Sequence, residues 1–181
     1  VSRHHVASLS TYEKSFNTGF SHFYGSASDY HILALLPGYI ERPNASLVEF
    51  DKVKAYYELT PESYGKLTWH ECVLYDTEGL DFVFNGADYV MHLAGMISYL
   101  KKDLNRLLEV NQQYTANVVN VAKDAGVKKL LYCSSIAAIA KSGKEDVIKE
   151  SAEWDDELAH SNYGYSKQLG ELEVWRGSEE G

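Results

Sequence analysis

The sequence has few residues of the kinds that bind metals or form disulfides. It contains two cysteines among 181 residues, Cys72 and Cys133, and each stands inside an apolar run. Small buried thiols behave as hydrophobic side chains, so we expect neither a disulfide nor a thiolate metal site from them. The seven histidines show no ligand spacing beyond the adjacent pair His4 and His5. We therefore predict no metal centre.

Long hydrophobic runs and an excess of positive charge are also missing. No apolar run is long enough to cross a bilayer and no signal-peptide pattern opens the chain, so we expect a cytoplasmic protein without a membrane partner. The chain has 17 basic and 26 acidic residues, which gives a net charge of −9. An acidic surface repels a phosphate backbone, and this argues against nucleic-acid binding.

Strand-like and helix-like segments alternate from residue 30 onwards. Short apolar runs predict strands at 31–36, 66–74, 88–95 and 127–135. Amphipathic or capped segments predict helices within 45–58 and at 76–86, 103–126 and 163–175. This alternation is typical of right-handed crossovers and of a mostly parallel sheet with helices on both faces. We predict a single α/β domain over residues 1–181, in which residues 1–30 are atypical because they show no sustained period.

The segment SNYGYSK places Tyr163 four residues before Lys167, at the start of the last predicted helix. That spacing puts both side chains on one face of the helix. Because the chain holds 14 tyrosines, such a spacing is expected by chance. Its surroundings must decide between a functional pair and a surface tyrosine beside a solvated lysine.

Small and polar residues end two of the predicted strands. Ala94 and Gly95 end the strand at 88–95, where a backbone could approach a flat cofactor, and Ser135 ends the strand at 127–135. Ligands of parallel α/β sheets bind beyond the carboxyl ends of the strands. A phenol needs a nearby ammonium to act as an acid or base near neutral pH, and a serine hydroxyl can hold a carbonyl or alcohol oxygen. This set predicts a site that moves a proton while a cofactor moves a hydride.

In the order of these motifs the sequence resembles the extended short-chain dehydrogenase/reductases, also called the NAD-dependent epimerase/dehydratase family. The resemblance covers about residues 30–181 and is carried by GADYVMHLAG, LLEVNQQYTANVVNVAKDAGVKKLLYCSS, YGYSK and KQLGELEVWRG. It implies a Rossmann-like three-layer α/β/α domain. It also implies an NAD(P)-dependent oxidoreductase that exchanges a hydride and a proton at a secondary alcohol or carbonyl of a small or sugar-linked substrate.

The resemblance further implies a role for each matching residue. Tyr163 would be the catalytic acid/base, and Lys167 would bind the nicotinamide ribose and favour the phenolate. Ser135 would polarise the substrate oxygen, and Asn111 would shape the site or relay protons through water. Ala94 and Gly95 would pack against the cofactor. Plainer alternatives stay open, in which Ser135 is a strand-end hydroxyl and Asn111 only caps or cross-links the backbone.

Parts of the family pattern are missing. The glycine-rich phosphate loop has no clear counterpart in residues 1–30, which hold only Gly19 and Gly25. No acidic residue ends the strand at 31–36 to hold an NAD ribose, and the nearby Arg42 favours NADP over NAD. The C-terminal substrate domain is absent, so we expect an incomplete fold.

These features leave more than one function open. The catalytic set favours an enzyme, whereas residues 1–30 favour a non-catalytic nucleotide-sensing or scaffold protein, or an inactive fragment of such an enzyme. Because members of the family often dimerise through the two helices that match residues 103–126 and 163–175, a homodimer through these helices is also expected.

Overall fold

The computed structural model describes residues 14, 18–19, 21–23, 25, 29–35, 70, 72, 75–139, 154 and 160–181. The chain forms two compact units, Val1–His31 with Gly38–His70 and Ile32–Pro37 with Glu71–Gly181. Within the described residues, all strands and all predicted site residues belong to the second unit. The single domain over residues 1–181 stays a prediction. The helix expected within 45–58 lies outside the described residues, as does most of the strand expected at 66–74.

Three parallel strands form the sheet of the second unit. They are β1 (Ile32–Leu35), β2 (Tyr89–His92) and β3 (Lys129–Tyr132), in the order β1-β2-β3. Leu35 pairs with His92, and His92 pairs with Tyr132, so the three carboxyl ends stand level. The strand predictions at 31–36, 88–95 and 127–135 are confirmed. Each observed strand is shorter than its predicted range.

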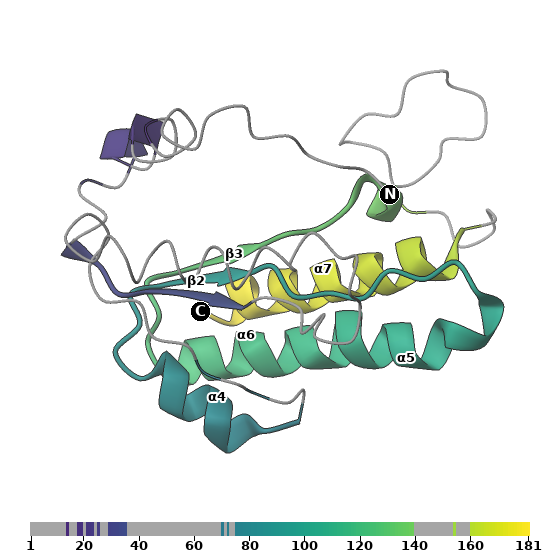
Figure 1. Cartoon of the computed structure of the whole chain (residues 1–181), viewed down its shortest axis with the longest axis horizontal. Coiled ribbons are helices and arrows are strands. Elements are labelled where there is room, and N and C mark those ends of the chain that lie inside the picture. The colour runs from purple at the N-terminus through teal and green to yellow at the C-terminus, as the bar shows by residue number, and fades with distance from the viewer. Residues whose placement is uncertain are drawn as a thin grey trace. The chain divides into compact units, whose positions relative to one another are not determined.

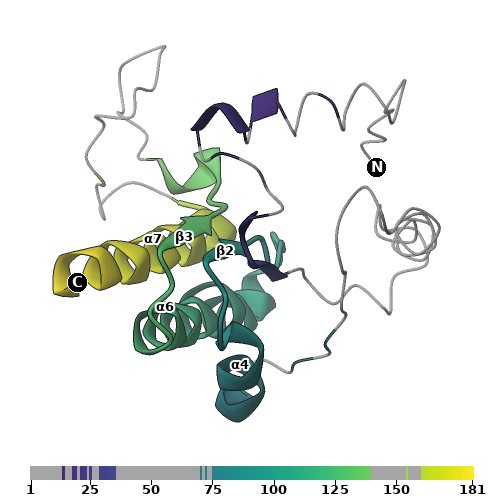
Figure 2. The ribbon, with the colours of Figure 1, turned by 90° about the vertical axis from the view of Figure 1, so that its left-hand side faces the viewer.

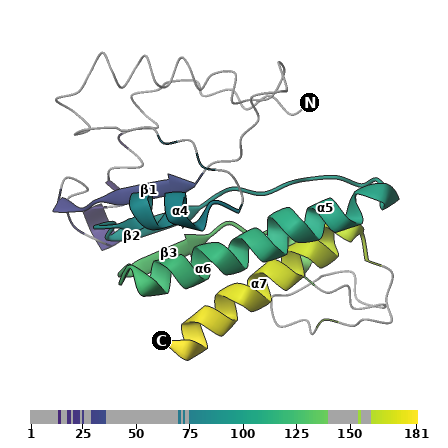
Figure 3. The same ribbon diagram turned by 90° about the horizontal axis from the view of Figure 1, so that it is seen from below.

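The helices follow the predicted order. They are α4 (Thr77–Phe84), α5 (Leu104–Leu108), α6 (Tyr114–Asp124) and α7 (Asn162–Glu180). A 3₁₀ turn, η3 (Lys101–Asp103), precedes α5, and another, η5 (Ile136–Ala138), follows β3. A π-helical turn, η4 (Glu109–Gln113), joins α5 to α6, and the three elements form one continuous rod that lies beside α7 (Figure 3).

Local chemistry sets the ends of these helices. The Asp76 carboxylate accepts the Gly79 amide at 2.8 Å and caps α4. Ser161 caps α7 in the same way, since its hydroxyl accepts the Gly164 amide at 3.0 Å. Gly126 follows α6 with a φ of +69°, a conformation that glycine adopts without strain.

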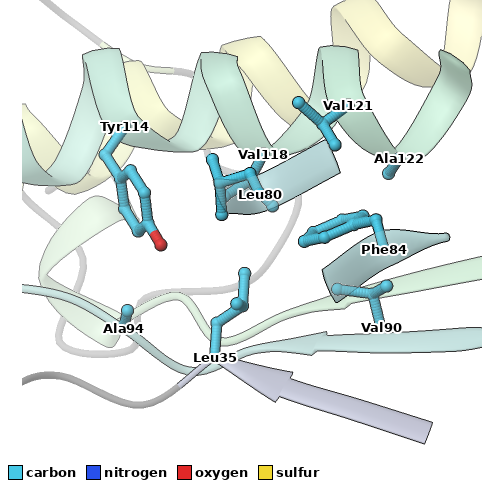
Figure 4. Packing of buried hydrophobic residues seen from close by; sticks show 9 residues of the cluster. All are labelled: Leu35, Leu80, Phe84, Val90, Ala94, Tyr114, Val118, Val121 and Ala122. Carbon is cyan, nitrogen blue, oxygen red and sulfur yellow. The ribbon is translucent and has the colours of Figure 1, made fainter. Parts of the chain in front are cut away.

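The hydrophobic core lies between the sheet and the helices. α4, α6 and α7 lie on one side of the strands (Figures 1 and 2). The buried cluster contains Leu35, Leu80, Phe84, Val90, Ala94, Tyr114, Val118, Val121 and Ala122 (Figure 4). On the strands, Ile32 and Leu131 are exposed. The described elements therefore supply a sheet and one helix layer, and the second helix layer expected from the sequence is not among them.

Candidate active site

The predicted site residues follow two neighbouring strands and begin one helix. Ala94 and Gly95 follow β2, Ser135 follows β3, and Tyr163 and Lys167 lie in the first turns of α7. Because His92 and Tyr132 are paired, the segments after β2 and β3 leave the sheet at the same edge. The structure thus brings the predicted residues to the carboxyl edge of the sheet, where α/β proteins bind ligands.

Asn111 is the centre of a buried hydrogen-bond network at this edge. It is 1% exposed, and its Oδ1 accepts the Met96 amide at 2.8 Å. Its Nδ2 donates to the Met96 carbonyl and to Ser166 Oγ, both at 2.9 Å. Ser166 Oγ then donates to the Tyr163 carbonyl at 2.8 Å. The side chain of Asn111 therefore joins the segment after β2 to the first turn of α7, which carries Tyr163.

The π turn η4 places Asn111 in this position. A π turn holds one residue more per turn than an α-helix, and such turns are frequent at functional sites. Asn111 is the middle residue of η4. The turn interrupts the α-helix at the point where a polar side chain must meet the backbone of another segment.

Gly95 is closely surrounded by this network. A Cβ atom at Gly95 would lie 3.3 Å from Asn111 Oδ1 and 3.9 Å from Lys167 Nζ. The first separation is tighter than ordinary carbon–oxygen contacts. The absence of a side chain at Gly95 therefore leaves room for both polar groups beside the backbone that follows β2.

Lys167 is buried although it carries an ammonium group. It is 4% exposed, and its Nζ donates to the Cys133 carbonyl at 2.8 Å. The ammonium also lies 4.2 Å from the centroid of the Tyr132 ring, where a cation is attracted by the π electrons. Burial lowers the pKa of Lys167 below its usual value. The ammonium is thus held at the end of β3 and one turn after Tyr163.

Ser135 and Tyr163 occupy the rim of the site. Ser135 Oγ accepts the Ala137 amide at 3.2 Å and caps η5. Tyr163 is half-buried, and its ring meets the ring of Tyr99 with centroids 6.0 Å apart. Within the described residues, the Tyr163 hydroxyl forms no hydrogen bond with Ser135 or Lys167. Their catalytic roles therefore stay predictions.

Comparison with protein-family models identifies the chain. The model of the 3-beta hydroxysteroid dehydrogenase/isomerase family matches residues 45–179. The chain belongs to this family. The match includes all predicted site residues, and the resemblance to the NAD-dependent epimerase/dehydratase proteins is confirmed with it.

The curated relatives of this chain include plant reductases. Cinnamoyl-CoA reductase 1 of Petunia hybrida is 28% identical over 121 residues, which are 64% of this chain and 35% of the relative. Anthocyanidin reductase of Arabidopsis thaliana is 29% identical over 130 residues, which are 64% of this chain and 37% of the relative. The chain thus spans about a third of the length of these relatives.

Solved structures share the fold at lower identity. A UDP-glucuronic acid 4-epimerase from Bacillus cereus, in complex with NAD, has a TM-score of 0.62 and 18% identity, with 84% of this chain and 45% of that chain covered. RMD from Pseudomonas aeruginosa, in complex with NADPH, has a TM-score of 0.55 and 20% identity, with 79% of this chain and 46% of that chain covered. The Rossmann-like α/β fold predicted from the sequence is thereby confirmed.

His92 is a buried residue beside the candidate site, and the sequence did not predict its role. It is fully buried, and its Nε2 lies 3.0 Å from Thr115 Oγ1. Because Thr115 Oγ1 gives its only proton to the Asn111 carbonyl at 2.8 Å, His92 Nε2 must be the donor. Burial, followed by the charge of Lys167, lowers the pKa of His92 to about 4. The one signal in the sequence was a histidine inside an otherwise apolar strand.

Three glycines let α7 approach its neighbours closely. A Cβ at Gly164 would overlap the Ala137 carbonyl oxygen, one at Gly170 would overlap the Asn111 carbonyl oxygen, and one at Gly177 would overlap Val119 Cγ1. The helix that carries Tyr163 and Lys167 is therefore seated against η5, η4 and α6 by backbone contact. The recurrence of these glycines in one helix is visible in the sequence, but no role was predicted for them.

Among the described residues, no group of three or more His, Cys, Asp or Glu side chains is placed to hold a metal ion. No helix in the described ranges is both long and apolar enough to cross a membrane.

Proposed function

We propose that this chain carries the nicotinamide-binding and proton-transfer half of an NAD(P)-dependent oxidoreductase of the epimerase/dehydratase or reductase type. The supporting observation is that Tyr163, Lys167 and Ser135 are gathered at one sheet edge above a buried network centred on Asn111. The substrate is a secondary alcohol or a carbonyl compound that is small or sugar-linked.

The described residues fit the nicotinamide end of such a cofactor. Gly95 lies beside Lys167 Nζ and carries no side chain of its own, so its backbone can lie close to a flat ring held near that ammonium. Ala94 precedes it and is buried. The buried Lys167 ammonium would donate to the ribose hydroxyls beside its present bond to the Cys133 carbonyl. A bound nicotinamide dinucleotide supplies or accepts the hydride.

Each side chain then has a distinct task. The Tyr163 hydroxyl gives a proton to, or takes one from, the substrate oxygen. The Ser135 hydroxyl donates a hydrogen bond to the same oxygen and holds it in place. The Lys167 ammonium favours the phenolate of Tyr163 electrostatically. Asn111 keeps the backbone after β2 and the start of α7 at a fixed separation through Met96 and Ser166.

NADP is proposed over NAD because of Arg42, which lies outside the described residues. An arginine that follows the strand at 31–36 can pair with the 2′-phosphate of NADP. Relatives by fold carry either cofactor, since one is a complex with NAD and another a complex with NADPH. The ratio of the two affinities therefore tests this part of the proposal by itself.

A homodimer through the helices predicted at 103–126 and 163–175 is proposed as well, in a single-domain cytoplasmic protein. The support is that α7 exposes Leu172 and Trp175 to solvent. The two side chains are three residues apart and share one face of the helix, and contiguous exposed apolar patches often mark interaction surfaces. Sedimentation velocity at increasing protein concentration tests this directly, and a monomer at every concentration would reject it.

The central proposal is tested by titrating the chain with NADPH and with NADH while nicotinamide fluorescence is recorded. Saturable binding of either supports the enzyme. Replacement of Lys167 by Met should weaken that binding, because the ammonium at the ribose is lost. Absence of binding to both cofactors would reject the oxidoreductase for this chain and favour the non-catalytic scaffold.

A further inference from the structure

The loop of residues 96–103 runs from β2 to α5 and is attached at two points to the machinery around Tyr163. At its start, the Met96 amide and carbonyl are both bonded to the Asn111 side chain. Near its end, the Lys101 carbonyl accepts Asn162 Nδ2 at 3.3 Å. Asn162 immediately precedes Tyr163 in α7. The loop therefore bridges the sheet edge and the first turn of the helix that carries Tyr163.

Hydrogen bonds inside the loop hold its turn together. Ser98 Oγ donates to Asp103 Oδ2 at 2.6 Å and accepts the Leu100 amide at 3.2 Å. The Asp103 amide donates to the Leu100 carbonyl at 3.1 Å. Tyr99 stands between Ser98 and Leu100, so its backbone is fixed although its side chain is 73% exposed.

The ring of Tyr99 meets the ring of Tyr163 edge to face. The centroids are 6.0 Å apart and the planes are inclined by 67°, which is a favoured arrangement for two aromatic rings. The phenol of Tyr163 swings about two side-chain torsions, and the helix restricts only the first of them strongly. A neighbouring ring held by a fixed loop restricts both.

We propose that Tyr99 is a positioning residue for Tyr163, which holds the Tyr163 phenol in the orientation needed for proton transfer. The proposal rests on the proposed role of Tyr163 as the proton carrier. Tyr99 acts through the contact of its ring and not through its hydroxyl. A displacement of the reacting group of the order of 1 Å can slow an enzyme about a hundredfold. Loss of the ring contact should therefore lower kcat more than it weakens substrate binding.

The contact itself can be tested without any turnover. A fluorine probe is introduced at one site by replacing Tyr163 with 3-fluorotyrosine, and its ¹⁹F resonance is compared in the parent, Tyr99→Ala, Tyr99→Phe and Ile97→Ala. Ile97 is the matched control because it lies in the same loop and is 53% exposed. We expect the resonance to shift in Tyr99→Ala, where the ring is lost, and to stay in place in Tyr99→Phe and Ile97→Ala. An unchanged resonance in Tyr99→Ala, or an equal shift in Ile97→Ala, would overturn the proposal.

The consequence for catalysis is tested on the same variants with NADPH or NADH and a substrate that is turned over. We expect Tyr99→Ala to lower kcat about tenfold or more while the Kd for the cofactor is unchanged, and Tyr99→Phe to restore kcat. An undiminished kcat in Tyr99→Ala, or a failure of Tyr99→Phe to restore it, would reject the positioning role. If the cofactor does not bind at all, the proposed function fails, and the fluorine experiment alone decides whether Tyr99 orients Tyr163.

Discussion

The side chain of Asn111 forms a pair of hydrogen bonds with the backbone of Met96, one in each direction. Its Oδ1 accepts the Met96 amide and its Nδ2 donates to the Met96 carbonyl. The Asn111 amide thus satisfies both backbone groups of Met96, as a neighbouring strand would do in a sheet. The segment that follows β2 is fixed by a helix, and its position is coupled to α7 through Ser166.

Replacement of Asn111 by Ala should reduce the free energy of unfolding by roughly 3 kcal/mol, because the Met96 amide and carbonyl and Ser166 Oγ all lose a buried partner. Urea denaturation measures this. Asn105→Ala is the control, since Asn105 is an exposed asparagine of α5 in the same rod, and it should change stability by less than about 0.5 kcal/mol. Equal effects of the two substitutions would contradict the network described here.

Replacement of Tyr163 by Phe should lower kcat about a hundredfold or more, since the proton carrier is lost. The cofactor Kd should stay nearly constant because the ring and its contact with Tyr99 remain. The matched control is Tyr165→Phe, two residues further along α7. A Tyr163→Phe protein with normal turnover would remove Tyr163 from the mechanism.

His92 should make the protein less stable in mild acid. Its pKa of about 4 in the folded protein lies below the ordinary value of 6.5, so folding favours neutral imidazole. The contribution of neutral His92 to the free energy of unfolding is complete above pH 6.5 and is lost as the pH falls from 6.5 towards 4. At about 1.4 kcal/mol per pH unit, the full loss amounts to about 3 kcal/mol.

This prediction is measured as the difference in the free energy of unfolding between the parent and His92→Gln at pH values from 4 to 7. Glutamine retains a donor for Thr115 but does not titrate. The difference should favour the parent increasingly as the pH rises to 6.5 and should be constant above it. A difference that is flat across the range would show that His92 is protonated equally in both states.

Lys167 should make the stability of the protein depend on pH in the alkaline range. Burial lowers its pKa in the folded protein below 10.5, so the unfolded chain binds more protons between that lowered value and 10.5. The stability of the parent relative to Lys167→Met should therefore increase with pH across this window. Urea denaturation from pH 7 to 10.5 measures it, with the exposed Lys102→Met as a control for loss of a surface charge. A relative stability that decreases with pH would reverse the sign and contradict the burial of Lys167.

Replacement of Gly177 by Ala should destabilise the protein by up to about 2 kcal/mol. Alanine favours a helix by about 1 kcal/mol over glycine, but its Cβ would overlap Val119 Cγ1, and overpacking costs about 1–3 kcal/mol. Valine cannot turn away easily because it is branched at Cβ. In a Val119→Ala background the same substitution should be neutral or stabilising, and a double-mutant cycle measures this coupling. Additive effects would show that the two residues do not meet.

The sequence predicted the positions of the strands and helices of the second unit better than it predicted their capping residues and the contacts between their side chains. Apolar runs and caps located β1, β2, β3 and their helices, because burial and turn chemistry are local signals. The sequence alone does not choose between Ser161 and Asn162 as the capping residue of α7, since both types cap helices and only the extended backbone of Ser161 decides. The order of motifs located Tyr163, Lys167, Ser135 and Asn111. Their contacts could not be predicted, because they depend on how α7 is seated by Gly164, Gly170 and Gly177.

The π turn at Asn111 makes the site depend on the number of residues as well as on their identities. One residue corresponds to a rotation of about 100° in an α-helix. Loss of a single residue from η4 would therefore turn α5 relative to α6 by more than a quarter of a revolution. Either Asn111 would leave Met96, or Tyr114 and Val118 would leave the core. Substitutions in this segment can weaken the protein by degrees, whereas an insertion or deletion would separate the chemistry of the site from the packing beneath it in one step.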